Sequence, residues 1–225
     1  MFHFKEKTIN KIKKYLTIFT TIQLLFSIGG RIAGVYTNSK MLFNIMLCTC
    51  MLLILIVPEH LFKHLSIKIP LELYFLVFLF AFCAIILGDV LNYYNYYPWW
   101  DSMLHFLSGV IIPFFGLWLI KLLMAEKSEL IYMNKTFTMI FILMLTMGLG
   151  AMWEIVEYTY DDLFNTNTQQ FMETTTGSLI SEEDIPLTGH DALNDTMKDL
   201  KLALGGSITV IAYASFKDRK KQKEN

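Results

Sequence analysis

The chain has 225 residues, of which 54% are hydrophobic and 17% are charged. Ordinary soluble domains are about 45–50% apolar and about 25% charged, so this composition excludes a disordered chain, a collagen-like repeat and a disulfide-stapled secreted scaffold. It favours a multi-pass membrane protein over a soluble enzyme. The formal net charge of -1 shows no overall basic character, and we therefore expect no nucleic-acid partner.

Six apolar stretches follow one another along the chain. A bilayer core of about 30 Å needs about 20 mostly apolar residues in a helix, and these stretches meet or approach that length. They cover residues 16–36, 41–57, 71–91, 103–124, 136–158 and 200–216, of which the second and sixth are short. The sequence therefore predicts an all-α polytopic membrane protein, a bundle of about six transmembrane helices that forms a single integral membrane domain over residues 1–225.

The basic residues predict how this bundle is oriented. Alternate segments hold 15 of the 19 Lys and Arg residues: the N-terminal tail, the loops after the second and fourth stretches, and the C-terminal tail. Basic residues accumulate in cytoplasmic loops. We therefore expect a cell-membrane protein with both termini in the cytoplasm. A cleaved signal peptide is the competing interpretation of the first stretch, although no convincing cleavage site follows Gly30.

One long polar connection, predicted over residues 160–198, would then lie outside the cytoplasm. It contains the runs NTNTQQ, TTTG and SEED. Connections of this length in compact proteins serve as lids or binding loops, or are disordered.

Three of the predicted helices each carry a pair of ionisable residues near their extracytoplasmic ends. The members of each pair are three or four residues apart and so share one helix face. The pairs are Asp101 with His105, Glu154 with Glu157, and Asp195 with Asp199. Ionisable groups in membrane helices are costly and are functional by default. We therefore predict that the three pairs meet in one site at the outer leaflet.

Clustered carboxylates repel one another, so they must be protonated, paired with a basic side chain or neutralised by a cation. One hypothesis is a divalent metal ion, the only cofactor that the residues suggest. Its candidate ligands are His105, Glu154, Glu157, Asp195 and Asp199. Another is general acid–base catalysis by His105, which Asp101 would orient from one turn away. The ordinary alternative is that the aspartates are first-turn acids of their helices and that His105 is a packing residue.

The same residues carry a resemblance to a known family. The runs WWDSMLHFLSGVIIPF, MWEIVEY and NDTMKDLKLALGG resemble the motifs of the YjdF-like family of bacterial inner-membrane proteins, a domain of unknown function. The matching positions are Asp101, His105, Phe106 and Gly109; Trp153, Glu154 and Glu157; and Asp195, Thr196 and Asp199. The likeness implies membership without an activity. A more distant similarity is to VanZ-like membrane proteins, which are linked to glycopeptide tolerance and envelope chemistry.

Three functional hypotheses remain open, and the sequence leaves undecided whether the protein is an enzyme. The first is an envelope enzyme acting on a lipid or lipid-linked substrate at the outer leaflet, with membrane lipids as its partners. The second is a cation- or proton-coupled transporter. The third is a non-catalytic membrane protein that binds a partner through its long loop. The near absence of polar residues from the inner halves of the later helices favours the first hypothesis over the second.

Overall fold

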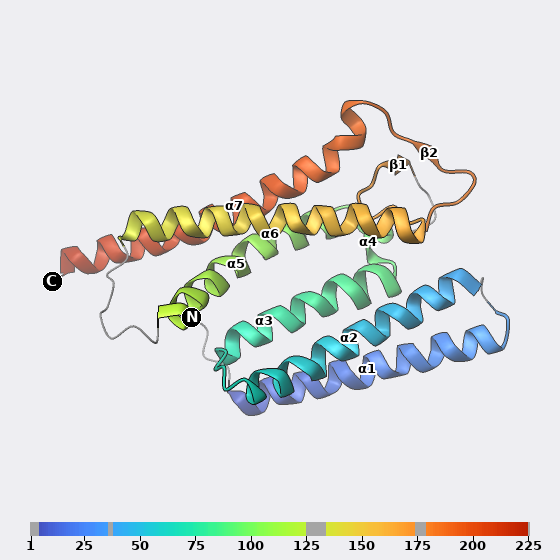
Figure 1. Cartoon of the computed structure of the whole chain (residues 1–225), viewed down its shortest axis with the longest axis horizontal. Helices are drawn as coiled ribbons and strands as arrows, with labels where there is room; N and C mark the ends of the chain where they lie inside the picture. Colours follow the sequence, from blue (N-terminus) through green and yellow to red (C-terminus); the bar gives the residue numbers. More distant parts are fainter. Residues whose placement is uncertain (1–4, 36–37, 125–133, 174–178, 225) are drawn as a thin grey trace. The chain divides into compact units, whose positions relative to one another are not determined.

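The computed structural model describes residues 5–35, 38–124, 134–173 and 179–224, most of which are helical (Figure 1). The elements in chain order are α1 (Glu6–Ile32), α2 (Asn38–His64), α3 (Leu71–Ala81), the π-helix η1 (Phe82–Val90), α4 (Tyr93–Tyr96), α5 (Trp100–Met124), α6 (Lys135–Phe164), β1 (Met172–Glu173), β2 (Ile185–Pro186) and α7 (His190–Glu224). The chain forms two compact units, Met1–Asp101 with Gly177–Leu179, and Ser102–Thr176 with Ile180–Asn225. The prediction of a single integral membrane domain stays a prediction.

In the first unit, α1, α2, α3 and η1 pack around a core of aliphatic and aromatic side chains. Met51 and Leu55 of α2 are fully buried together with Phe78 of α3 and Ile86 of η1. The Tyr74 hydroxyl donates a hydrogen bond of 3.1 Å to the Leu55 carbonyl oxygen, so its polar end is satisfied beside this apolar core. The continuous apolar run predicted at 71–91 is therefore a helix over 71–90, whose second half widens into η1.

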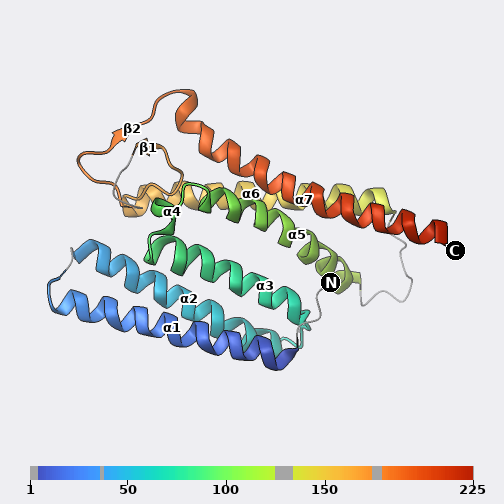
Figure 2. The ribbon, with the colours of Figure 1, turned by 180° about the vertical axis from the view of Figure 1, so that it is seen from behind.

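In the second unit, α7 packs along α6 and against α5. Figure 2 shows α6 and α7 side by side, as does Figure 1. A Cβ atom on Gly109 of α5 would overlap the Ala203 carbonyl group of α7, and one on Gly206 would overlap the Phe106 carbonyl oxygen. Because these two positions lack side chains, the backbones of α5 and α7 approach to van der Waals contact.

The connection between α6 and α7 is shorter than the sequence predicted. The predicted connection 160–198 includes helical turns at both ends, because α6 continues to Phe164 and α7 already begins at His190. Its position outside the cytoplasm stays a prediction. A helix can continue with polar residues beyond the hydrocarbon core of the bilayer. The points where the sequence becomes polar therefore do not coincide with the ends of α6 and α7. Between them, β1 and β2 form a short antiparallel pair. Residues 174–178 of this connection lie outside the described residues. So does Lys127, one of the basic residues in the loop after the fourth apolar stretch.

Five helices of the described chain are long and apolar enough to cross a membrane. They are Glu6–Ile32, Ser39–His64, Leu71–Val90, Trp100–Met124 and Lys135–Phe164. They contain three of the six predicted spans completely and most of two others, because the first helix ends at Ile32 rather than at residue 36 and the third at Val90 rather than at residue 91. Residue 36 lies outside the described residues. The sixth, 200–216, lies within α7, which is not among these helices. The count of six and the orientation of the termini therefore stay predictions.

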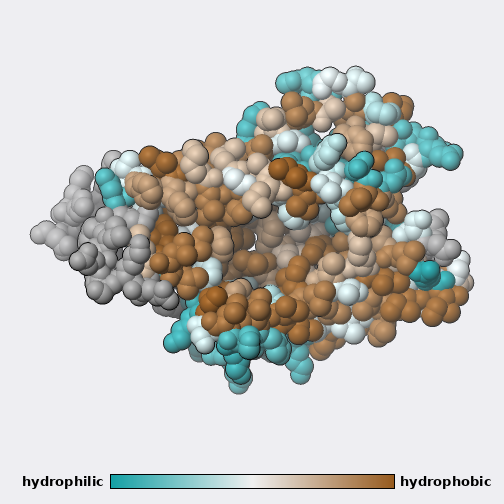
Figure 3. Space-filling view, viewed as in Figure 1, coloured by the Kyte–Doolittle hydropathy of each residue, from teal (hydrophilic) through white to brown (hydrophobic). Residues whose placement is uncertain are grey.

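The apolar stretches of these five helices are poorly buried by the protein itself. Only 11–33% of the residues in each most apolar window are buried. In the space-filling view the helices expose extensive hydrophobic surface, whereas the connection that carries β1 and β2 is mostly hydrophilic (Figure 3). Such extensive exposed apolar surface is typical of helices that contact lipid.

The contact between α5 and α7 predicts opposite effects of alanine at two adjacent glycines. Gly206→Ala would place a Cβ against the backbone of α5, and overpacking of this kind costs about 1–3 kcal/mol. Gly205 has open space around it, so Gly205→Ala should leave stability unchanged or raise it by up to about 1 kcal/mol. Thermal unfolding of the detergent-purified variants measures both. Equal melting temperatures would contradict the close packing of these helices.

Candidate functional site

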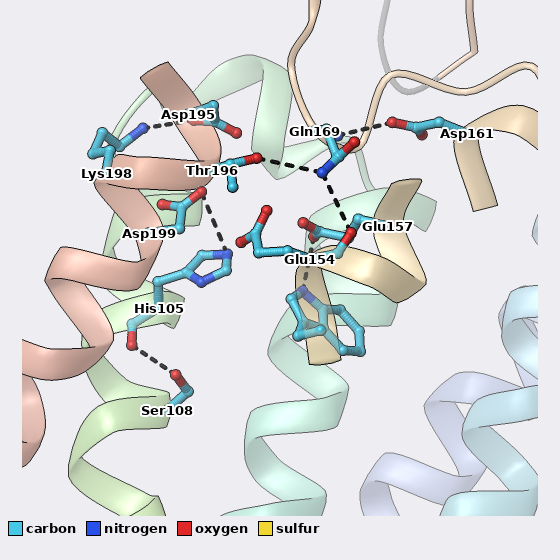
Figure 4. Close-up of polar contacts among 11 residues, drawn as sticks. His105, Ser108, Glu154, Glu157, Asp161, Gln169, Asp195, Thr196, Lys198 and Asp199 are labelled. Atoms are coloured by element: carbon cyan, nitrogen blue, oxygen red, sulfur yellow. Dashed lines mark hydrogen bonds and ion pairs between the residues drawn. The ribbon is translucent and has the colours of Figure 1, made fainter. Parts of the chain in front are cut away.

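Four ionisable side chains converge in the second unit, and they come from three different helices. The ring of His105 on α5 and the carboxylates of Glu154 and Glu157 on α6 each offer a ligand atom, and these atoms all lie within 4.8 Å of one another. Asp199 on α7 forms a second group with His105 and Asp101, and its Oδ2 atom is 3.7 Å from His105 Nε2 (Figure 4). We refer to His105, Glu154, Glu157 and Asp199 as the polar cluster.

Glycines beneath the polar cluster explain how the three helices bring these groups together. Gly109 is one turn from His105 on α5, and Gly206 is two turns from Asp199 on α7. On α6, Gly150 is one turn from Glu154, and a Cβ there would lie 3.1 Å from Leu200 Cδ2 of α7. The helices are therefore closest immediately below the charged residues. The Thr146 hydroxyl donates a 3.1 Å hydrogen bond to Ser207 Oγ on this same side, within the buried interface.

Glu154 is the least satisfied member of the polar cluster. Its side chain is only 6% exposed, and neither carboxylate oxygen has a hydrogen-bond partner among the residues that the structure describes. Asp199 is 1% exposed, so two carboxylates are buried next to one imidazole. An ionised carboxylate without a partner is very costly to bury. The polar cluster can therefore hold a positive charge, either as bound protons or as a cation.

The edge of the polar cluster is built from groups that do have partners. Trp153 Nε1 donates a 2.8 Å hydrogen bond to Glu157 Oε1, which restrains the position of this carboxylate. Gln169, from the connection after α6, lies between α6 and α7. Its Nε2 atom is 3.3 Å from the Glu154 carbonyl oxygen and 3.3 Å from Thr196 Oγ1. The connection therefore contacts two of the helices that carry the site.

The six residues predicted for the site do not all join it. Asp101 lies in the first turn of α5, and its carboxylate offers a ligand atom within 4.8 Å of those of His105 and Asp199. Its role in orienting His105 stays a prediction. Asp195 instead accepts a 2.9 Å hydrogen bond from Lys198. It does not belong to the groups of described residues whose ligand atoms converge. Its predicted role as a metal ligand is thus left without support from the geometry.

Asp161, on the same stripe of α6 as Glu154 and Glu157, has a structural role. Its carboxylate accepts four hydrogen bonds of 2.6–3.0 Å: from the Thr166 hydroxyl, from the backbone NH and hydroxyl of Thr168, and from the backbone NH of Gln169. These bonds fold the chain back over the end of α6 after Asn165, which has a left-handed conformation. Asp161 thereby places Gln169 beside the polar cluster.

Sequence reasoning did not identify Gln169 or the role of Asp161. The run NTNTQQ indicates only a polar loop, because side-chain periodicity ends with the helix. Threonines that follow an acidic residue near a helix end are a weak signal for such a turn, since their hydroxyls and backbone NH groups can bond to a nearby carboxylate.

Comparison with known proteins identifies the family. A family model described as "Predicted membrane protein (DUF2238)" matches residues 15–220. The chain belongs to this family, which is consistent with the predicted resemblance to YjdF-like membrane proteins. The more distant similarity to VanZ-like proteins stays a prediction. No curated protein and no solved structure matches the chain.

The turn held by Asp161 predicts a local effect of its removal. Hydrogen bonds to charged groups contribute about 1.5–3 kcal/mol each. Asp161→Ala should therefore increase hydrogen exchange of the amides of Thr168 and Gln169 by about tenfold or more, as measured by mass spectrometry. The exposed neighbour provides a matched control, because Asp162→Ala should leave this exchange unchanged. Similar protection in both variants would show that Asp161 does not hold the turn.

Proposed function

We propose that this member of the DUF2238 family is a cell-membrane enzyme whose polar cluster acts on a lipid or lipid-linked substrate at the outer leaflet. The proposal includes six spans with both termini in the cytoplasm. The observation that carries it is a buried, unpartnered Glu154 beside a His105–Asp199 pair, at the end of helices that are otherwise apolar. Ionisable groups in such helices mark functional sites.

The sixth span is supported by packing rather than by hydropathy. Ala203, Gly206 and Ser207 of α7 are buried, and they face α5 and α6. Both of those helices have membrane length and composition. A helix that is in contact with two membrane helices along its middle turns has to share their depth. This packing supports a sixth span over residues 200–216, which would give the even number of spans that the basic residues at both ends of the chain indicate.

The three helices also agree on the depth of the polar cluster. Glu154 is 19 residues after Lys135 at the start of α6, His105 is 19 residues before Met124 at the end of α5, and Asp199 is 18 residues before Lys217 on α7. At 1.5 Å per residue each interval is about 28 Å, close to the thickness of the hydrocarbon core. If the basic ends lie at the inner surface, the polar cluster lies at the outer edge of the hydrocarbon, next to the lipid headgroups.

At that depth, His105 is the candidate general acid or base. Imidazole is the side chain that exchanges a proton most readily near neutral pH, so a histidine at this place can accept and return a proton during turnover. Asp199 is 3.7 Å from Nε2 and stabilises the protonated ring, while Asp101 lies one turn away on the same helix. The carboxylates of Glu154 and Glu157 face the same space. A headgroup ester entering from the outer surface would meet the imidazole and these carboxylates together.

The alternative of a cation- or proton-coupled transporter is less well supported than an enzyme. The segments 106–124 and 136–153 of α5 and α6, which lie below the polar cluster, contain no Asp, Glu or His. Transport pathways for protons or cations use such residues along their length. A purely partner-binding role is also less well supported, because the connection after α6 contacts the helices of the polar cluster through Gln169.

The topology predicts which positions a membrane-impermeant thiol reagent reaches. In a variant with Cys48, Cys50 and Cys83 replaced by Ala, Glu182→Cys should be labelled on intact cells. Lys220→Cys should be labelled only after the membrane is permeabilised. Glu182 and Lys220 are both exposed, so a difference between them reports the side of the membrane rather than burial. Labelling of both positions on intact cells would place the C-terminus outside and exclude six spans.

The enzyme proposal predicts a change in the lipids of producing cells. Cells that contain the wild-type protein should differ in one lipid or lipid-linked species from cells without it, as measured by mass spectrometry. Loss of a general acid or base costs about 100-fold or more in rate. His105→Ala and Glu154→Gln should therefore abolish the difference at equal protein levels, whereas Asp162→Asn should retain it. An unchanged lipid profile with cation uptake in reconstituted vesicles would favour the transporter instead.

A further inference from the structure

We infer that the polar cluster binds one divalent transition-metal ion, with His105, Glu154, Glu157 and Asp199 as its ligands. This inference rests on the proposed function for what the ion would do, whereas its binding can be tested separately. In the occupied site His105 would be a metal ligand instead of the general acid or base, because the ring nitrogen that binds the ion cannot also accept a proton. The ligand atoms of His105, Glu154 and Glu157 already lie within 4.8 Å of one another. Asp199 converges with His105 and Asp101 in a second, overlapping group, and its Oδ2 atom, 3.7 Å from His105 Nε2, is the candidate fourth donor from the third helix.

The spacing of His105 and Asp199 fits two ligands of one ion better than a direct bond. Their Nε2 and Oδ2 atoms are 3.7 Å apart, which exceeds the usual 2.7–3.2 Å of a hydrogen bond. Metal–ligand bonds of about 2.0–2.1 Å in tetrahedral geometry separate two ligands by about 3.3–3.4 Å. A movement of a few tenths of an ångström would therefore bring both atoms to a shared ion.

Glu154 provides an independent reason for a cation. Its carboxylate is 94% buried and lies between His105 and Glu157, and neither oxygen has a hydrogen-bond partner in the described part of the chain (Figure 4). By contrast, Asp161 on the same helix has four donors to its carboxylate. Among the described residues, the fold thus provides hydrogen-bond donors to the carboxylate of Asp161 but none to that of Glu154. A bound cation would satisfy both oxygens of Glu154 at once.

The donor set indicates the class of metal. One imidazole nitrogen with carboxylate oxygens suits Zn²⁺, Mn²⁺ or Fe²⁺, whereas Mg²⁺ and Ca²⁺ prefer oxygen ligands throughout. Cys48, Cys50 and Cys83 all belong to the first unit, so the second unit has no thiolate that would select a softer ion. Three carboxylates and one neutral imidazole would give the occupied site a net charge of -1. Protonation of Glu154 is the competing way to neutralise the polar cluster.

The test uses the full-length protein purified in detergent, stripped with a chelator and titrated with Mn²⁺ or Zn²⁺. Electron paramagnetic resonance follows free Mn²⁺, and calorimetry follows Zn²⁺. We expect one saturable site per chain, with the dissociation constant raised at least tenfold in Glu154→Gln and in His105→Asn. Asp162→Asn, an exposed acid on the same helix, should bind as the wild type does. Asp195→Asn should also bind the metal ion with wild-type affinity, since Asp195 pairs with Lys198.

Each outcome of this titration is informative. No saturable binding by the wild type, or equal affinity in Glu154→Gln and Asp162→Asn, overturns the metal site and leaves protonation of Glu154 as the explanation. Because glutamine nearly matches glutamate in shape, an unchanged melting temperature for Glu154→Gln shows that weaker binding is not caused by unfolding. Metal binding without any effect of the protein on cellular lipids would retain the metal site and reject the proposed function.

Discussion

The close approach of α5 and α7 at Gly109 and Gly206 is the contact on which the candidate site depends. His105 lies one turn from Gly109, and Asp199 lies two turns from Gly206, so the separation of their side chains follows the separation of the two backbones. In a membrane there is little hydrophobic force to bring helices together, and small residues allow the close packing that replaces it. The same glycines that stabilise the second unit therefore also determine whether imidazole and carboxylate share one space.

Two carboxylates of α6 show how this space differs from an ordinary polar surface. Asp161 and Glu154 are seven residues apart and both are 6% exposed. Asp161 receives four hydrogen bonds from the chain that follows α6, and its burial is thereby offset. Glu154 has no such donors among the described residues, yet it is held between helices whose backbones cannot move apart without losing their packing. A stable fold that retains so costly a group is best understood if a ligand or a proton completes it.

Much of this arrangement could be predicted because it depends on local geometry. Residues four apart on a helix share a face, so the pairing of Asp101 with His105 follows from the sequence alone. What could not be predicted depends on tertiary contacts. Asp195 and Asp199 are also four apart, but only Asp199 lies against His105, whereas Asp195 pairs with Lys198. The length of the connection was overestimated because polar helical turns beyond the bilayer look like a loop in sequence. The sixth predicted span, 200–216, is hard to test by hydropathy because polar turns precede it in the same helix, α7.

The polar cluster is closed on one side and bordered by polar groups on the other, and this asymmetry bears on its chemistry. On the deeper side, Thr146 and Ser207 are fully buried and bond to each other, next to the glycine contacts. On the opposite side, Gln169 contacts the Glu154 carbonyl group and Thr196, and its position depends on the turn held by Asp161. Among the described residues, the polar groups that border the cluster therefore lie on the side that carries the connection. Such an arrangement suits a reaction on a molecule presented at one membrane surface, because a pathway across the bilayer needs polar groups on both sides of its binding site.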